Sequence, residues 1–184
     1  MLPEGVKMTP MLRQYTEWKE RYPDCLLFFR MGDFYEMFFD DARTAAEVLD
    51  IALTARDPER RIPMAGVPVH AVDSYLGRLV RGGHRVAICE QIGDPQGGGS
   101  LVERRVVRVV TPGTYVPDEG GSEGRLAAVS GERGALSLAL LAPAVGTLEV
   151  GTLPEEEALA TLSAFAPQEI LVPERPPQAL SSRG

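Results

Sequence analysis

The first apolar positions of the chain recur at helical spacing, which predicts an amphipathic helix between residues 10 and 22. Thr9 precedes it as an N-cap, and Pro10 occupies the first helical position, where its missing N–H costs nothing. Pro23 then ends the helix. The chain should therefore begin with one helix that buries a single face.

The next two apolar runs predict a β-hairpin. Residues 25–31, CLLFFRM, form a continuous apolar run that is typical of a buried strand. Gly32 and Asp33 form a tight turn, and residues 34–38, FYEMF, return as a short second strand.

Alternation along the returning strand puts a carboxylate between two aromatic side chains. Phe34, Glu36 and Phe38 should share one face, with Tyr35 and Met37 on the other. Composition alone favours an ordinary interpretation, in which Phe34 is core and Glu36 guards an edge strand against pairing with other chains. The alternative is that both are presented near the turn, where a ring can stack on a nucleobase and a carboxyl group can hydrogen-bond its edge.

The rest of the first part alternates helices with strands, which predicts an α/β fold with a mixed β-sheet flanked by helices. The segment PMAGVP, residues 63–68, has two prolines around one glycine and predicts a rigid loop. The helices are expected at residues 40–49 and 70–81, and the strands at residues 50–56, 84–92 and 101–112.

A cluster of proline, glycine and acidic residues at 116–124 predicts a domain boundary. We expect a first domain over residues 1–117, a linker over 118–124 and a second unit over 125–184. Three strands, a helix with three acids in its first turn and a fourth strand are expected in that second unit. About 60 residues are few for an independent α/β domain, so we expect a truncated one.

Composition and charge are those of a soluble, globular chain. The hydrophobic content is 44% and the charged content 24%, and the sequence contains neither a long apolar run nor a signal peptide, so a cytoplasmic location is expected. Cys25 and Cys89 are expected to be buried, reduced thiols rather than a bridge or metal ligands. The net charge of −7 is concentrated after residue 117, where 4 basic residues face 10 acidic ones, so the first part keeps local basic groups.

Three segments of the first part carry a resemblance to a known family. GDFYEMFFDDA, PMAGVPVHAVDSYLGRLVRGGHRVAICEQIGDP and VERRVVRVVTPGT closely resemble the N-terminal mismatch-recognition domain of the MutS family of bacterial DNA mismatch repair proteins. The resemblance covers roughly residues 9 to 117. It implies that Phe34 is a wedge inserted beside a mispaired or unpaired base, and that Glu36 is the acid that hydrogen-bonds this base.

The remaining candidates are contacts to the DNA backbone, which supply affinity without sequence information. The arginines of the last strand are expected on its wet side, and the family places the 63–68 loop near DNA, where Met64 to Val67 could brace the minor groove. His70 fits a helix cap or a contact on the DNA side. The backbone candidates are Arg56, Arg60, Arg61, Met64, His70, Arg104, Arg105 and Arg108.

The resemblance carries further expectations. Residues 125–173 are similar in strand and helix order to the start of that family's connector domain, which implies a partial RNase H-like α/β connector over 125–184. The family also has an ATP-binding domain that uses ATP and Mg²⁺, a homodimer contact and a downstream repair partner. None of these has a counterpart in the 184 residues. The chain is therefore expected to be a monomer that binds mismatched duplex weakly in the nucleoid, with no cofactor, enzymatic activity or membrane contact of its own.

A different class of function stays open at this point. Four acids lie within nine residues, namely Asp33, Glu36, Asp40 and Asp41, and carboxylates are the ligands that Mg²⁺ prefers. They could serve a metal-dependent nuclease. Against this, Asp40 and Asp41 open a predicted helix, where the helix dipole favours them without a metal.

Overall fold

The chain divides into two compact units, residues 1–110 and 111–184. The computed structural model describes residues 7–57, 59, 61–93, 102–117, 124–132 and 134–181. The predicted linker at 118–124 lies outside the described residues except for Gly124, whose backbone N–H donates to the carbonyl oxygen of Tyr115 at 3.1 Å.

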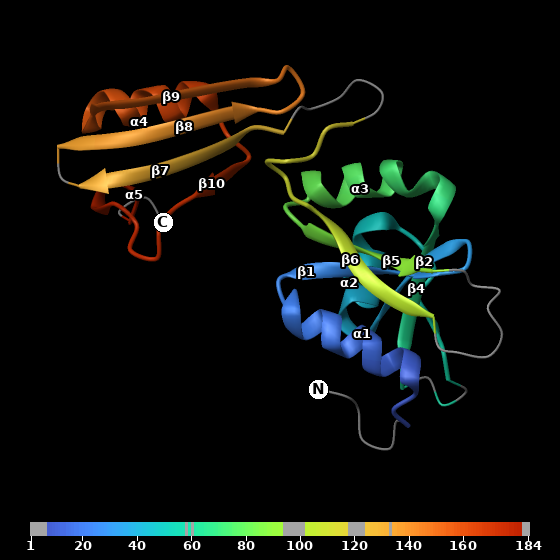
Figure 1. Cartoon of the computed structure of the whole chain (residues 1–184). Coiled ribbons are helices and arrows are strands. Elements are labelled where there is room, and N and C mark those ends of the chain that lie inside the picture. The colour runs from blue at the N-terminus through green and yellow to red at the C-terminus, as the bar shows by residue number, and fades with distance from the viewer. Residues whose placement is uncertain are drawn as a thin grey trace. The chain divides into compact units, whose positions relative to one another are not determined.

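A six-stranded mixed sheet forms the centre of the first unit (Figure 1), as the sequence predicts. The strands β1 and β5 pair in parallel, and the other neighbours pair antiparallel. In spatial order the strands are β3 (Thr54–Ala55), β4 (Pro63–Pro68), β2 (Phe34–Phe38), β1 (Cys25–Met31), β5 (Arg85–Ile92) and β6 (Glu103–Val110).

Helices cover this sheet on both sides. Helix α1 (Pro10–Arg21) packs on the face that carries Leu27 and Phe29, and its N-cap Thr9 accepts the N–H of Leu12 at 3.3 Å as predicted. The buried sides of α2 (Phe39–Leu49) and α3 (Val72–Arg81) lie against the opposite face. A short 3₁₀ turn, η1 (Val69–Ala71), joins β4 to α3.

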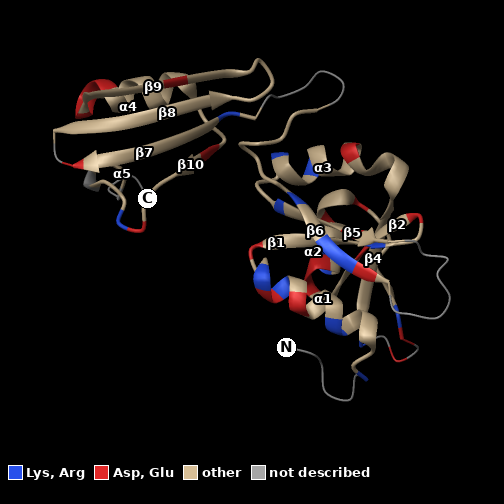
Figure 2. Cartoon of the chain, in the orientation of Figure 1, with Lys and Arg blue, Asp and Glu red and all other residues tan. Residues whose placement is uncertain are grey.

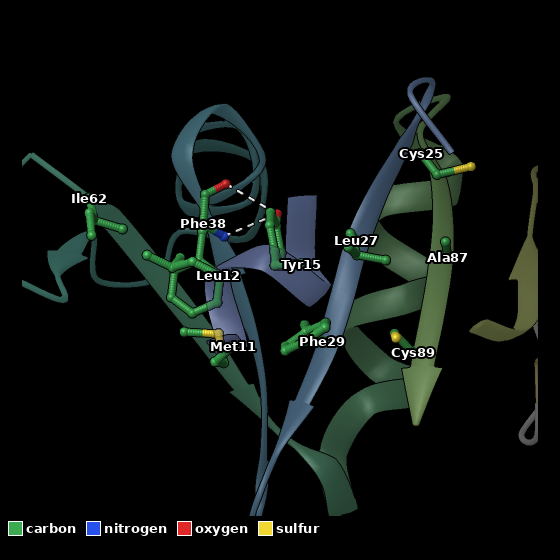
Figure 3. Packing of buried hydrophobic residues seen from close by; sticks show 10 residues of the cluster. All are labelled: Met11, Leu12, Tyr15, Cys25, Leu27, Phe29, Phe38, Ile62, Ala87 and Cys89. Carbon is green, nitrogen blue, oxygen red and sulfur yellow. Dashed lines mark hydrogen bonds between the residues drawn. The ribbon is translucent and has the colours of Figure 1, made fainter. Parts of the chain in front are cut away.

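Tyr15 of α1 is the centre of the core on the α1 face (Figure 3). Its ring meets Phe29 and Phe38 edge-on, with centroids 5.5 and 5.0 Å away. Its hydroxyl donates to Oδ2 of Asp41 at 2.9 Å and accepts the backbone N–H of Phe38 at 3.2 Å. Burial raises the pKa of Tyr15 well above its ordinary value, so the hydroxyl stays protonated and available as a donor. The two cysteines lie buried in the same core, as expected.

Asp41 is the buried charge that joins three elements. Only 5% of this residue is exposed, and its carboxylate accepts from Tyr15, from the backbone N–H of Leu27 at 3.0 Å and from Nζ of Lys19 at 2.8 Å. From the sequence, Asp41 is either an acid in the first turn of a helix or one of four candidate Mg²⁺ ligands. The structure adds that it binds α1 and β1 to that turn.

Two expectations about the middle of the chain were wrong. Residues 63–68 are the strand β4, not a loop, because Pro63 and Pro68 occupy the two ends, where a missing N–H is tolerated. The strand expected at 50–56 is reduced to the two residues of β3, because only Thr54 and Ala55 pair with β4.

The second unit is also α/β. Its sheet has the spatial order β10 (Glu169–Leu171), β7 (Leu126–Glu132), β8 (Ala135–Ala142) and β9 (Thr147–Pro154), with β10 parallel to β7 and the rest antiparallel. Helix α4 (Glu155–Phe165) packs on one face through Ala158 and Leu162, and α5 (Gln178–Ser181) follows. On β9, Val150 is 73% exposed.

Within the described residues, no helix is long and apolar enough to cross a membrane.

We expect Asp41→Ala to lower the free energy of unfolding by about 3 kcal/mol, because it leaves the buried N–H of Leu27 without an acceptor and Lys19 without its anion. Asp41→Asn, which keeps a carbonyl oxygen, should lose less. Urea unfolding of the three proteins measures this. A loss below about 0.5 kcal/mol for Asp41→Ala, the range of ordinary surface changes, would contradict the role given to this carboxylate.

Candidate nucleic-acid interface

The β1–β2 hairpin presents Phe34 to solvent. Gly32 has a φ of +61°, and a positive φ at only the first central residue fits a type II′ turn, which closes a two-residue hairpin. Phe34 pairs with Met31 across this turn and is 47% exposed. The interpretation of Phe34 as a core residue is therefore excluded.

Glu36 lies on the same face as Phe34 and is mostly enclosed. Its side chain is 21% exposed, and its buried Oε2 has no hydrogen-bond partner among the residues that the structure describes. Burial raises the pKa of this carboxyl group, while the positive charge of Arg56, whose Nη1 lies 3.6 Å from Oε2, opposes the rise. The charge of the carboxylate is thus balanced by a cation, but its Oε2 accepts no hydrogen bond from the described residues.

Arg56 is held beside Glu36 by weak contacts from neighbouring strands. Its guanidinium lies over the ring of Phe38, 5.7 Å from the centroid, and its Nη1 is 3.9 Å from the sulfur of Met31. Its backbone N–H donates to Ile62 at 3.0 Å, which fixes the residue just after β3. None of these side-chain contacts is strong, so the guanidinium can exchange partners at low cost.

Strand β4 leaves room beside this pair. Gly66 lies opposite Glu36, and a Cβ at this position would be 3.6 Å from Cγ of Glu36 and 3.8 Å from Cδ1 of Phe34. Met64, two residues earlier, lies on the same face. Ala65 and Val67 point the other way into the core, so of the expected groove-bracing segment only Met64 and Gly66 remain available.

The name hairpin site is used here for Phe34, Glu36, Arg56 and Met31, together with the space left by Gly66. It offers an aromatic face, an acceptor without a donor and one cation. An aromatic face and a carboxylate acceptor suit a flat heterocycle with an N–H on its edge, which is the chemistry of an unstacked nucleobase.

The sequence predicted that the arginines of β6 all lie on its solvent-exposed side, and the structure shows that one of them does not. Arg105 and Arg108 are exposed, and Figure 2 shows the basic middle of this strand. Arg104, in contrast, is only 8% exposed. Its guanidinium lies 4.9 Å over the ring of Phe29 and donates to the carbonyl of Arg30 at 2.8 Å. The placement of Arg104 on the solvent side was wrong, because a bulge between its strand and β5 leaves it facing α1.

The other backbone candidates are placed unevenly. His70 is exposed on η1, close to the hairpin, since the N–H of Val69 donates to the carbonyl of Asp33 at 2.9 Å. The N-cap position of α3 is occupied by Ala71 and not by His70, and no side chain of the described residues caps this helix end. Arg61 contacts Asp57 at 3.3 Å and also pairs with Glu59. Arg60 lies outside the described residues.

The four carboxylates of the nuclease hypothesis are not brought together. Asp41 is buried in the core, whereas Asp40 is exposed and pairs with Arg43 at 3.7 Å. In the described part of the chain, no three His, Cys, Asp or Glu side chains lie close enough to hold a metal ion. The structure gives this hypothesis no support.

Sequence reasoning missed Met31 as part of the site. Met31 belongs to a predicted strand, and its sulfur meets Arg56, which is 25 residues away in the sequence. Gly66 lay within the expected groove-bracing segment, but its place opposite Glu36 depends on the pairing of β4 with β2, which the prediction of a loop did not include. Both placements depend on contacts between segments that are distant in the sequence.

The sequence profile of a family described as MutS domain I matches residues 9–119, which is more than half of the chain and includes the whole hairpin site. The chain belongs to the MutS family.

A curated relative extends this match. The DNA mismatch repair protein MutS of Clostridium perfringens is 47% identical over 176 residues, which covers 91% of this chain and 19% of the relative. The chain thus spans about a fifth of the length of the MutS protein it matches.

We expect Glu36 to titrate above the ordinary glutamate range, and Arg56→Ala to move its pKa higher still, because the opposing positive charge is removed. Carboxyl carbon shifts in an NMR titration measure both values, with Arg56→Lys as the charge-preserving control. Because the pKa is raised in the folded state, the contribution of Glu36 to stability is fully present below its unfolded pKa and is lost as pH rises through the folded value. A lower pKa in Arg56→Ala would contradict the pairing.

Proposed function

We propose that this chain is the mismatched-DNA binding module of a MutS-type repair protein, in which Phe34 enters the duplex beside a mispaired or unpaired base and Glu36 hydrogen-bonds that base. The observation that carries the proposal is the exposure of Phe34, 47%, beside the donor-free oxygen of Glu36, within the residues that match MutS domain I. The curated MutS relative is named as a DNA mismatch repair protein, which supports the same partner.

Discrimination comes from the energy of deforming the duplex. Unstacking a base step costs a few kcal/mol, and one aromatic stack returns about 1 to 3 kcal/mol, so insertion of Phe34 into sound duplex is close to balance or unfavourable. At a mismatch the pairing and stacking are already weakened and the duplex kinks more easily. The same ring then inserts with a net gain. The module therefore detects a mechanical defect and not a base sequence.

Glu36 adds a second condition. A carboxylate near phosphates is repelled, and Oε2 of Glu36 already lacks a donor among the described residues of the free protein. A base edge exposed by the wedge supplies an N–H at this point. Arg56 can balance the charge of Glu36 while the protein is free, and nearby phosphates can compete for the same guanidinium once DNA is bound. Glu36 thus favours DNA only where a base edge is accessible.

The contacts to phosphate come from the exposed cations of the first unit. Arg105 and Arg108 on β6 are the best placed by exposure, and His70 lies next to the hairpin turn. Arg56, Arg61 and Met64 remain candidates, and Arg60 is retained on sequence grounds alone. Arg104 is better explained as an internal support of β1, because its guanidinium is bonded to the backbone.

The role of the second unit and of the whole protein forms part of the same proposal. The order β10-β7-β8-β9 with α4 before β10 supports an RNase H-like start of the connector domain over residues 125–184. The complete protein would act in the cytoplasm at the nucleoid as a homodimer, with ATP and Mg²⁺ in another domain and a downstream repair partner.

We expect Phe34→Ala to weaken binding to a mismatched duplex by about 5- to 150-fold, the value of one base–aromatic stack, and to leave binding to matched duplex unchanged. Fluorescence anisotropy with labelled duplexes at low salt measures the ratio. Val145→Ala removes an exposed apolar side chain from the second unit and serves as the control. Full mismatch selectivity in Phe34→Ala would overturn the proposed function.

We expect Arg105→Ala and Arg108→Ala to weaken binding to matched and mismatched duplexes equally. Each change should reduce the magnitude of the slope of log K against log salt by about 1, because it removes one phosphate contact. Arg81→Ala, an exposed arginine of α3, should leave the slope unchanged. Binding measured from low to moderate salt tests this. If Arg81→Ala changes the slope as much as the β6 variants do, β6 is not the phosphate-binding strand.

A further inference from the structure

A polar cluster lies on the face of the sheet opposite the hairpin site. Tyr35 is buried between the two site residues Phe34 and Glu36, and its hydroxyl donates to Oε1 of Glu90 on β5. Oε2 of Glu90 lies 3.6 Å from Nη1 of Arg30 on β1. Three strands therefore meet in one chain of polar contacts at the level of the hairpin tip.

Arg30 closes this cluster onto the turn itself. Its Nε donates to the carbonyl oxygen of Gly32 at 2.5 Å, and its guanidinium lies over the ring of Tyr35, 5.6 Å from the centroid. One arginine thus contacts the turn residue, the neighbouring strand and the tyrosine between the two site residues. This is more than a single surface ion pair provides.

The ladder between β1 and β5 shows why the tip needs such a tie. Its last paired residues are Phe29 and Cys89, so backbone pairing to β5 ends before the tip begins at Arg30. On the other side, pairing with β4 continues to Phe34, which lies opposite Pro68. Among the described residues, the tip is therefore linked to β5 through the side chain of Glu90, and to β6 through the bond from Arg104 to the Arg30 carbonyl.

We propose that Arg30, Tyr35 and Glu90 are positioning residues that fix the hairpin tip, so that Phe34 and Glu36 keep their orientation when the ring enters a duplex. The proposal rests on the proposed function of the hairpin site and adds three residues to it. Since burial and the bond to Glu90 raise the pKa of Tyr35 to about 12, its hydroxyl remains a donor throughout the neutral range.

The physical reason is pre-organisation. Insertion of the ring at a mismatch gives only a small net gain in binding free energy. If the tip were loose in the free protein, the entropy cost of ordering it on binding would cancel part of that gain. On matched duplex, where the ring does not insert, a loose tip costs nothing. Loosening the cluster should therefore reduce the ratio of mismatched to matched affinity, whereas lost stability alone would reduce both affinities together.

The test compares two tyrosine-to-phenylalanine changes in the 184-residue chain. Tyr35→Phe removes the bond to Glu90, and Tyr15→Phe removes a buried bond of the same kind, to Asp41, on the α1 side of the core. Both are measured by thermal unfolding and by anisotropy with matched and mismatched duplexes at low salt. We expect about a 3- to 10-fold loss of the affinity ratio in Tyr35→Phe, the value of one hydrogen bond, and none in Tyr15→Phe.

Changes at Glu90 complete the cycle. Glu90→Gln keeps an acceptor for Tyr35 and should retain most of the ratio, whereas Glu90→Leu should lose at least as much as Tyr35→Phe, because it also removes the contact to Arg30. The double variant Tyr35→Phe/Glu90→Leu should lose no more than Glu90→Leu alone, because that single change already removes the bond to Tyr35.

Each outcome separates this proposal from the proposed function. If Phe34→Ala abolishes the ratio while Tyr35→Phe and Glu90→Leu leave it intact, the positioning role is refuted and the proposed function stands. An equal loss in Tyr15→Phe and Tyr35→Phe also refutes it, because general destabilisation then explains the effect. If Phe34→Ala itself leaves the ratio unchanged, the proposed function fails first.

Discussion

The two-residue alternation of side chains along β2 is the constraint on which both faces of this region depend. Phe34 and Glu36 must point to one face, so the residue between them must point to the other, where Tyr35 meets Glu90. Phe38 lies on the face of Phe34 and Glu36, at the other end of the strand, where it enters the core beside Tyr15. A five-residue strand thus joins an exposed ring at one end to the best-packed part of the unit at the other.

The hairpin site carries costs that a purely structural surface would avoid. A large ring is left in water, and the buried Oε2 of Glu36 has no donor among the described residues. Such groups are rare in folded proteins, and where they occur a binding role is a reasonable explanation. Among the described residues of the first unit, the only other buried side-chain oxygen without a partner is Oε1 of Gln14, whereas the buried carboxylate of Asp41 accepts from three donors. The contacts of Asp41 that stabilise the unit and the residues of the hairpin site therefore lie at different places along the sheet.

Local patterns predicted the elements that depend on local physics. The N-cap at Thr9, both hairpin strands and the Gly32 turn follow from capping, apolar runs and turn chemistry. What failed depended on distant partners. The two prolines of β4 made the segment look like a loop, although it forms a strand through its pairing with β2. The burial of Arg104 depends on a bulge between β5 and β6 and on contact with α1. Composition alone favoured a core position for Phe34, because aromatic residues are usually buried, and the exposed ring shows that this interpretation was wrong.

The central claim is that the ring of Phe34 enters a duplex only where pairing has failed. The most direct measurement is NMR of the chain with aromatic labels, titrated with a mismatched duplex and with its matched counterpart. The account predicts large upfield shifts of the Phe34 ring protons and contacts from them to bases beside the mismatch, with neither seen on matched DNA. A Phe34 ring whose signals stay unchanged when the chain is saturated with mismatched duplex would contradict it.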